Sequence, residues 1–281
     1  MRLGGPVFVD SHDPELIARA HRELGYRAGY CPGGLTLDDP ARVRAVREAF
    51  ARHDVVIAEA GCWNNLMDPD EDRRRANIKA MQETLALADE VGALCVVNIA
   101  GSRDPERWDG PHPDNYSQET FDLAVANARE IIDAVRPRRA KLTYEMMPFC
   151  PPDSADSYLR LMAAIDRPAF AVHLDVVNII NGVDRYFANR AVIEECFRKL
   201  GPHIVSCHLK DIRLESQLTV HLNEVLVGEG ALDIAAHLRE VQKLAHDPPV
   251  MLEHLQTAEE YDRARAHVMR VAREIGVSLE E

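Results

Sequence analysis

The alternation of short apolar runs with amphipathic stretches constrains the fold of this chain more than any other feature. Runs of four to seven residues, rich in Val, Ile, Leu, Tyr and Cys, recur from one end of the sequence to the other. Such runs are typical of strands that are buried on both faces of a parallel sheet. The strands are predicted at residues 7–10, 26–31, 54–60, 94–100, 141–146, 170–175, 204–210 and 250–255.

Helical periodicity fills the segments between these runs. Over residues 73–91 and 121–135, apolar residues return every three or four positions, which gives each segment one apolar face. Start signals support further helices at 14–24, where Asp13 precedes Pro14, and near 155–166, which follows Ser154. The segments therefore predict a helix after each strand.

Eight strands in strict alternation with helices predict an α/β fold, a (β/α)₈ TIM barrel that forms a single domain over residues 1–281. An open doubly wound sheet is the structural alternative. Its usual dinucleotide-binding signature, G-x-G-x-x-G after the first strand, is missing. No linker or low-complexity segment divides the chain. The long polar segment 101–117 is expected at the C-terminal rim of the barrel, where the active sites of such barrels lie.

Charge and composition exclude several kinds of partner. The chain has 46 Asp and Glu against 33 Lys and Arg, a formal net charge of −13, which disfavours binding to nucleic acid. No run approaches 18 apolar residues, and the N-terminus lacks the apolar segment of a signal peptide. The six cysteines form no C-x-x-C pair. We therefore expect a cytoplasmic protein with no membrane partner; the sequence leaves open whether it forms a homo-oligomer.

Ionisable residues near the C-terminal ends of the last four predicted strands are the main functional signal. They are Glu145, Asp175, His208 and Glu253. A single Glu or His at a strand end is often a structural residue, but four in consecutive strands converge on one rim of a parallel barrel. Three carboxylates gathered there would repel one another, and a divalent cation removes that cost. Three carboxylates and one imidazole suit one Mn²⁺, Mg²⁺ or Co²⁺ ion, and Zn²⁺ is also allowed.

These residues lie in motifs that resemble the sugar phosphate isomerase/epimerase superfamily of xylose isomerase-like TIM barrels. The motifs are LTYEMMP, HLDVVN, SCHLKD, GEGALD and MLEHL, and the resemblance covers essentially the whole chain. In the ketose 3-epimerase branch, the metal ligands that match are Glu145, Asp175, His208 and Glu253, and the two glutamates act as the acid/base pair. Two departures matter. Asn178 replaces a substrate-contacting His, and Lys210 stands near the position of an Arg, as in inosose-processing members.

A metal site of this kind implies proton transfer next to a carbonyl group. A divalent ion that binds a carbonyl oxygen and the adjacent hydroxyl makes the intervening C–H acidic by stabilising an enediolate. Glu145 and Glu253 could then remove and return the proton. We therefore expect an isomerase or epimerase of a small sugar, polyol ketone or related hydroxy-carbonyl compound. Loss of a hydroxyl, as in a dehydratase of an inosose-like substrate, is the alternative reaction.

Further polar residues are candidates for contact with the substrate, although each has a structural interpretation as well. Lys210 has the parity of His208 and is expected to point inward, unless it forms a rim salt bridge with Asp211 or Glu229. His173 is expected one layer deeper than Asp175, where it would orient that carboxylate. His254, with the opposite parity to Glu253, is expected to face the helices. The complete set of candidates is Asn178, Lys210, His221, Trp63, Asn98, His112 and His173.

Two other functions compete with this interpretation. An apurinic endonuclease-like nuclease needs more histidines at the strand ends and a basic groove, so the chain disfavours it. A non-catalytic barrel that binds a polyol would have no need of two opposed carboxylates. No phosphate-binding Gly-rich loop with Lys and Ser is apparent, which favours an unphosphorylated substrate.

Overall fold

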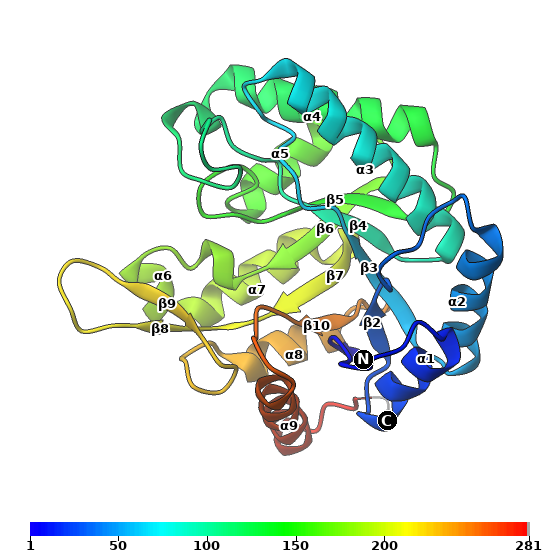
Figure 1. The fold of residues 1–281 in the computed structure, drawn as a ribbon. Helices are drawn as coiled ribbons and strands as arrows, with labels where there is room; N and C mark the ends of the chain where they lie inside the picture. Colours follow the sequence, from blue (N-terminus) through cyan, green and yellow to red (C-terminus); the bar gives the residue numbers. More distant parts are fainter. Residues whose placement is uncertain (280–281) are drawn as a thin grey trace.

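The computed structural model describes residues 1–279 and forms a closed parallel barrel surrounded by helices (Figure 1). The strands follow one another around the barrel in chain order, and β1 closes it against β10 and β2. The barrel strands are β1 (Leu3–Gly4), β2 (Ala28–Tyr30), β3 (Val56–Gly61), β4 (Cys95–Asn98), β5 (Lys141–Glu145), β6 (Phe170–Asp175), β7 (Ile204–Leu209) and β10 (Val250–Leu252). The predicted TIM barrel is confirmed.

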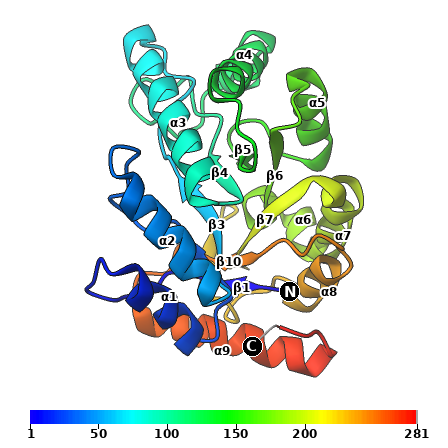
Figure 2. The same ribbon diagram turned by 90° about the vertical axis from the view of Figure 1, so that its right-hand side faces the viewer.

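Helices form a ring around these strands when the barrel is seen end on (Figure 2). Sequence-coded caps define several helix starts: the Asp13 side chain accepts a hydrogen bond from Glu15 N, and Ser154 forms a capping box with Ser157. The helices are α1 (Pro14–Glu23), α2 (Pro40–Arg52), α3 (Glu71–Val91), α4 (Gln118–Val135), α5 (Ala155–Ile165), α6 (Val183–Phe187), α7 (Asn189–Leu200), α8 (Ile234–Gln242) and α9 (Ala258–Ile275).

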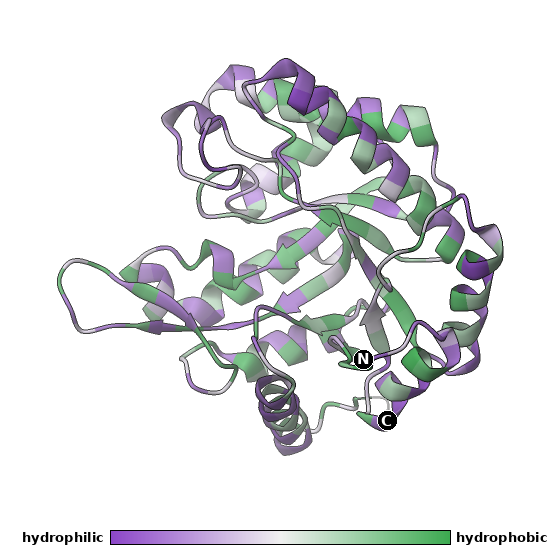
Figure 3. Ribbon diagram, in the orientation of Figure 1, coloured by the Kyte–Doolittle hydropathy of each residue, from purple (hydrophilic) through white to green (hydrophobic). Residues whose placement is uncertain are grey.

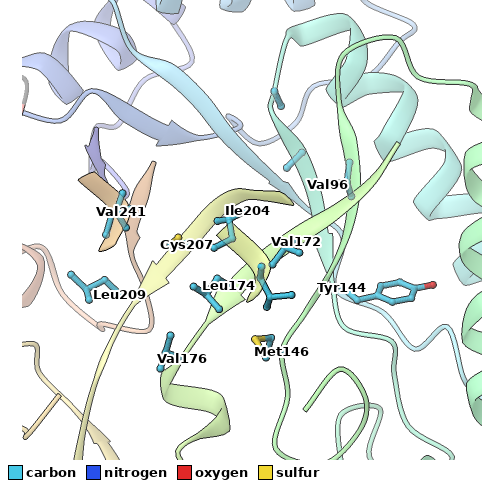
Figure 4. Packing of buried hydrophobic residues seen from close by; sticks show 14 of the residues in the cluster. Val96, Tyr144, Met146, Val172, Leu174, Val176, Ile204, Cys207, Leu209 and Val241 are labelled. Carbon is cyan, nitrogen blue, oxygen red and sulfur yellow. The ribbon is translucent and has the colours of Figure 1, made fainter. Parts of the chain in front are cut away.

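The main hydrophobic core lies between the strands and the helices. Every residue of β6 is buried, because one face of the strand meets the helices and the other faces the barrel interior. Val172 and Leu174 belong to the core cluster (Figure 4), while His173 and Asp175 alternate with them and face the interior. The outer surfaces of the helices are predominantly polar (Figure 3). Alternation along a buried strand therefore brings polar groups into the barrel.

The first strand differs from its prediction. Residues 7–10 were expected to form it, but they lie outside regular structure, and Phe8 is largely exposed. The strand that pairs is the shorter β1, which ends before Pro6. Proline has no backbone N–H and so cannot donate a hydrogen bond to a neighbouring strand. A Cβ atom at Gly4 would lie 2.4 Å from Met251 Sδ and 2.7 Å from Ala28 O. A glycine is therefore required where the barrel closes.

Two features at the C-terminal rim extend beyond the barrel. The strands β8 (Asp211–Leu214) and β9 (Leu222–Val225) pair as an antiparallel hairpin, which projects beside α6 (Figure 1). The long segment after β4 contains a short 3₁₀ helix, η1 (Pro113–Tyr116), and is held by the buried Asn115, whose Nδ2 donates to Phe149 O and Gly110 O. Within residues 1–279, none of the helices combines the length and apolar character that a membrane span requires.

Candidate metal centre

The structure brings together the four ionisable residues that were predicted from the strand ends. Glu145 and Asp175 are the last residues of β5 and β6, His208 lies in β7, and Glu253 directly follows β10. His208 Nδ1 is the common neighbour: it lies 2.9 Å from Glu253 Oε2, 3.2 Å from Glu145 Oε1 and 3.7 Å from Asp175 Oδ2. One ligand atom from each residue can be chosen such that all four lie within 4.8 Å of one another.

Lys210 and Asn178 border this cluster. The Lys210 side chain is almost fully buried, and its Nζ lies 2.7 Å from Asp175 Oδ2 and 3.6 Å from Glu253 Oε2. Asn178 Oδ1 accepts a hydrogen bond from Lys210 Nζ at 2.9 Å, and its Nδ2 donates to Glu145 Oε1 at 3.1 Å. Lys210 therefore points inward, as its parity predicted, and the alternative salt bridge with Asp211 or Glu229 is wrong.

Burial and charge shift the protonation equilibria of the cluster in different directions. Burial raises the pKa of Glu145. Burial acts in the same sense on Asp175, but the Lys210 ammonium and His208 outweigh it and hold the pKa of that carboxyl below its usual range. For His208, burial is outweighed by Glu253, Glu59 and Glu145, which raise the pKa of the imidazole well above its usual value. Negative charge therefore dominates this part of the interior.

The residues fit a divalent cation. Asp175 Oδ2 and Glu253 Oε2 are buried and accept no hydrogen bond of normal geometry from any described residue, although Lys210 Nζ and His208 Nδ1 lie near them. Three largely buried carboxylates share one lysine and one histidine, and a divalent cation would offset the negative charge that is left. Three oxygen donors and one imidazole nitrogen are a ligand set that Mn²⁺, Mg²⁺ and Co²⁺ accept.

A second buried cluster, absent from the sequence predictions, lies directly behind His208. Glu59 in β3 is 2% exposed. Its Oε2 lies 3.0 Å from His208 Nε2, its Oε1 lies 3.0 Å from His173 Nε2, and the Ser206 hydroxyl donates to Oε1. Burial alone would raise the pKa of Glu59, but His208 and His173 hold it well below its usual range. The only sequence signal was a Glu inside the apolar run VVIAEA.

Two histidines take other contacts than those expected. His173 Nε2 hydrogen-bonds the Glu59 carboxylate rather than Asp175, and His173 Nδ1 has no hydrogen-bond partner among residues 1–279. His254 does not face the helices: its ring lies 3.1 Å from Glu224 Oε2 and 3.4 Å from Glu253 Oε1. Strand alternation fails there because β10 ends at Leu252 and His254 adopts a positive φ of 60°.

The remaining candidates lie at the rim, and within residues 1–279 they make no hydrogen bond or ion pair with the four-residue cluster. Asn98 is buried and exchanges hydrogen bonds with Asn64. His112 caps η1 by accepting from Asp114 N. Trp63 is 47% exposed after β3, and His221 directly precedes β9. Their contact with a substrate stays a prediction.

A cavity of about 340 Å³ opens at the same rim, above β1 and β2. Tyr30 forms part of its wall, and the Tyr30 hydroxyl donates to Leu252 O at 3.0 Å, one residue before Glu253. The described residues that line the cavity do not include Glu145, Asp175, His208 or Glu253. Other residues that line it include Pro6, Val7, His12, Cys31 and Arg42.

Comparison with solved structures supports the same architecture. The probable 3-DHS dehydratase AsbF of Bacillus anthracis superposes with a TM-score of 0.72 at 16% identity, covering 97% of this chain and 99% of that one. D-psicose 3-epimerase from Clostridium cellulolyticum H10, solved with D-tagatose, gives 0.69 at 12% identity, with 99% and 100% covered. A xylose isomerase-like TIM barrel protein from Mycobacterium smegmatis, solved with magnesium, gives 0.66 at 16% identity, with 93% and 88% covered.

Sequence comparison places the chain in a family. The comparison with curated proteins gives no match. A family model, however, matches residues 18–271, which include every strand of the barrel except β1 and all four residues of the candidate metal cluster. The chain belongs to the xylose isomerase-like TIM barrel family.

Proposed function

We propose that this protein is a divalent-metal-dependent isomerase or epimerase of a small sugar, polyol ketone or related hydroxy-carbonyl compound. The observation that carries the proposal is the position of the two glutamates. Glu145 and Glu253 come from strands on either side of the β6–β7 pair, yet both carboxylates reach the same nitrogen, His208 Nδ1. A substrate bound over that point would have one carboxylate on each side.

The proposed roles follow from this placement. Glu145, Asp175, His208 and Glu253 would hold the ion, which when bound supplies a positive charge that acidifies a C–H next to a carbonyl group. Glu145 or Glu253 removes that proton, and the other carboxylate returns one. Burial raises the pKa of Glu145, which makes this carboxylate a stronger proton acceptor. Return to the opposite face gives an epimer, and return to the neighbouring carbon gives an isomer.

Several features support a small polar substrate. Solved neighbours include enzymes whose names specify sugar substrates, D-psicose 3-epimerase and L-ribulose 3-epimerase. Lys210 and Asn178 lie beside the carboxylates, where an ammonium and an amide can hydrogen-bond hydroxyl or carbonyl oxygens. An unphosphorylated substrate remains our preference.

A dehydratase is the second candidate, and Lys210 favours it. A buried ammonium 2.7 Å from Asp175 can hydrogen-bond a departing hydroxyl and stabilise the negative charge that develops on its oxygen in β-elimination. One of the solved neighbours is a probable dehydratase. Arg213, by contrast, is exposed and pairs with Glu215, so it does not contribute to the cluster.

One experiment tests the proposal and separates the two reactions. The purified protein is analysed for bound metal and then incubated in D₂O with ketoses, inososes and hydroxy-keto acids. An isomerase or epimerase incorporates one deuteron at carbon without loss of water, whereas a dehydratase yields a product 18 mass units lighter before isotope correction. Metal-free protein as purified, with no exchange after Mn²⁺, Mg²⁺ or Co²⁺ is added, would contradict the proposal.

A further inference from the structure

The buried Glu59 network has no place in the proton-transfer chemistry, yet it contacts His208 from behind. His208 presents its two ring nitrogens to different surroundings: Nδ1 faces Glu145, Asp175 and Glu253, and Nε2 lies 3.0 Å from Glu59 Oε2. A neutral imidazole carries its proton on only one nitrogen. The partner of Nε2 therefore decides whether Nδ1 has a free lone pair for a metal ion.

We infer that Glu59 is a positioning residue that fixes His208 as the Nε2–H tautomer and thereby leaves Nδ1 free to bind the ion. This inference rests on the proposed metal site, since it concerns how one ligand of that site is prepared. Carboxylates that accept the second N–H of a metal-bound histidine commonly strengthen metal binding by 10-fold to 100-fold.

Three contacts hold Glu59 in this role. Its Oε1 is shared by His173 Nε2 and the Ser206 hydroxyl, which leaves Oε2 directed at His208. The rings of His173 and His208 meet edge to face, with centroids 4.1 Å apart, so the His208 ring has little freedom to turn. His173 is completely buried and Ser206 likewise, so water does not compete for the carboxylate. Glu59 comes from β3, so the network ties β3 to β6 and β7 across the barrel interior.

A second ion bound by Glu59, His173 and His208 is the competing interpretation, because their ligand atoms also lie within 4.8 Å of one another. The hydrogen bonds favour the positioning role. Both oxygens of Glu59 already lie within hydrogen-bond distance of His173, Ser206 or His208, and an ion bound there would displace these contacts. Glu59, His173 and His208 are each 2% exposed or less, so the site is closed to solvent.

The test measures metal binding and the tautomer separately from activity. Mn²⁺ affinity and stoichiometry are determined by electron paramagnetic resonance for the wild type, Glu59→Gln and His173→Gln. The last variant disturbs the same buried network without removing the acceptor of His208 Nε2, and is the matched control. We expect one ion per chain, a 10-fold to 100-fold loss of affinity in Glu59→Gln, and a smaller loss in His173→Gln.

Nitrogen NMR of the wild type keeps the inference testable even where a variant fails to fold. In Mg²⁺-loaded protein labelled with ¹⁵N-histidine, His208 is expected to show a protonated Nε2 and an unprotonated Nδ1. A proton on Nδ1, equal affinities in all three proteins, or two ions per wild-type chain would each overturn the role of Glu59. Failure of the wild type to bind any ion is a different result, because it removes the proposed function and this inference with it.

Discussion

Lys210 Nζ lies 2.7 Å from Asp175 Oδ2, in a part of the interior where both side chains are at most 1% exposed. The pair is surrounded by further negative charge, since Glu253 Oε2 lies 3.6 Å and Glu224 Oε2 lies 3.5 Å from the same nitrogen. Burial alone would lower the pKa of Lys210, but these carboxylates raise it above its usual range. The lysine is thus a fixed positive charge beside the candidate metal ligands.

Replacement of Lys210 by Met should affect metal-free and metal-bound protein in opposite ways. Loss of one partner from a buried ion pair costs about 3–5 kcal/mol of unfolding free energy in the metal-free protein. Removal of a neighbouring positive charge should at the same time tighten Mn²⁺ binding about 10-fold or more. Urea unfolding and isothermal titration calorimetry measure the two effects. Weaker metal binding in Lys210→Met would show that the lysine does not compete with the ion.

Lys199→Met is the matched control for this variant. Lys199 also contacts two carboxylates, Asp156 and Glu195, but it lies on the outer surface of the helix layer. Surface ion pairs contribute about 0–1 kcal/mol, so this substitution should change stability little. It should leave Mn²⁺ affinity unchanged, because it lies in another part of the molecule from the carboxylate cluster.

Metal addition should stabilise the folded protein. At a free ion concentration 100 times the Kd, linkage predicts about 2.7 kcal/mol of additional stability, which corresponds to roughly 5 °C or more in Tm. Thermal unfolding of chelator-treated protein with and without Mn²⁺ measures this shift. Asp175→Asn, which removes one negative charge from the ligand set, should show a much smaller shift. Equal shifts in the two proteins would place the ion elsewhere.

Glu145→Gln should reduce kcat by about 10²-fold to 10⁴-fold at saturating metal, because it removes one member of the acid/base pair. Glu253→Gln should have an effect of similar size on the complete reaction. Deuterium exchange separates the two roles. For each epimer used as substrate, the variant that keeps the carboxylate that removes the proton should still exchange the carbon-bound proton of that substrate with solvent, although it forms no product. Near-wild-type turnover of Glu145→Gln would exclude that residue from proton transfer.

The strands that carry the candidate site were predictable because burial on both faces leaves a continuous apolar run. Residues 170–175 form β6 as predicted, and Glu145, Asp175 and His208 occupy the ends expected of them. Because the C-terminal ends of parallel strands meet at one rim, the proximity of these residues can be predicted without knowledge of their side-chain contacts. The same argument explains why the inward orientation of Lys210 could be predicted. Lys210 directly follows β7 and lies two residues after His208, so its side chain points to the same side of the strand.

Features that depend on distant partners could not be predicted in this way. Glu59 is 114 residues from His173 and 149 residues from His208, so nothing near it in the sequence indicates its role. Residues 7–10 have the composition of a strand, but the close approach of three strands around Gly4 decides which segment pairs. His254 depends on a local backbone turn that follows the end of β10.

His237 provides a prediction that does not involve the metal cluster. It lies in α8, completely buried against Phe197, and neither ring nitrogen has a hydrogen-bond partner among the described residues. Burial lowers the pKa of His237 to about 4, against an opposing effect of Asp175. The folded state therefore keeps this ring neutral at pH values where the unfolded chain, with a histidine pKa of about 6.5, binds a proton.

The sign of the resulting pH dependence follows from linkage. Between about pH 6.5 and about pH 4, the unfolded state binds more protons at His237 than the folded state, so stability falls as the pH falls. In His237→Leu this contribution is absent. The difference in unfolding free energy between variant and wild type should therefore grow by about 1.4 kcal/mol per pH unit below the unfolded pKa. Urea unfolding from pH 7.5 to pH 4.5 measures this difference. His203→Leu, at an exposed position, is the control. Parallel curves for His237→Leu and wild type would show that the buried ring is protonated without cost.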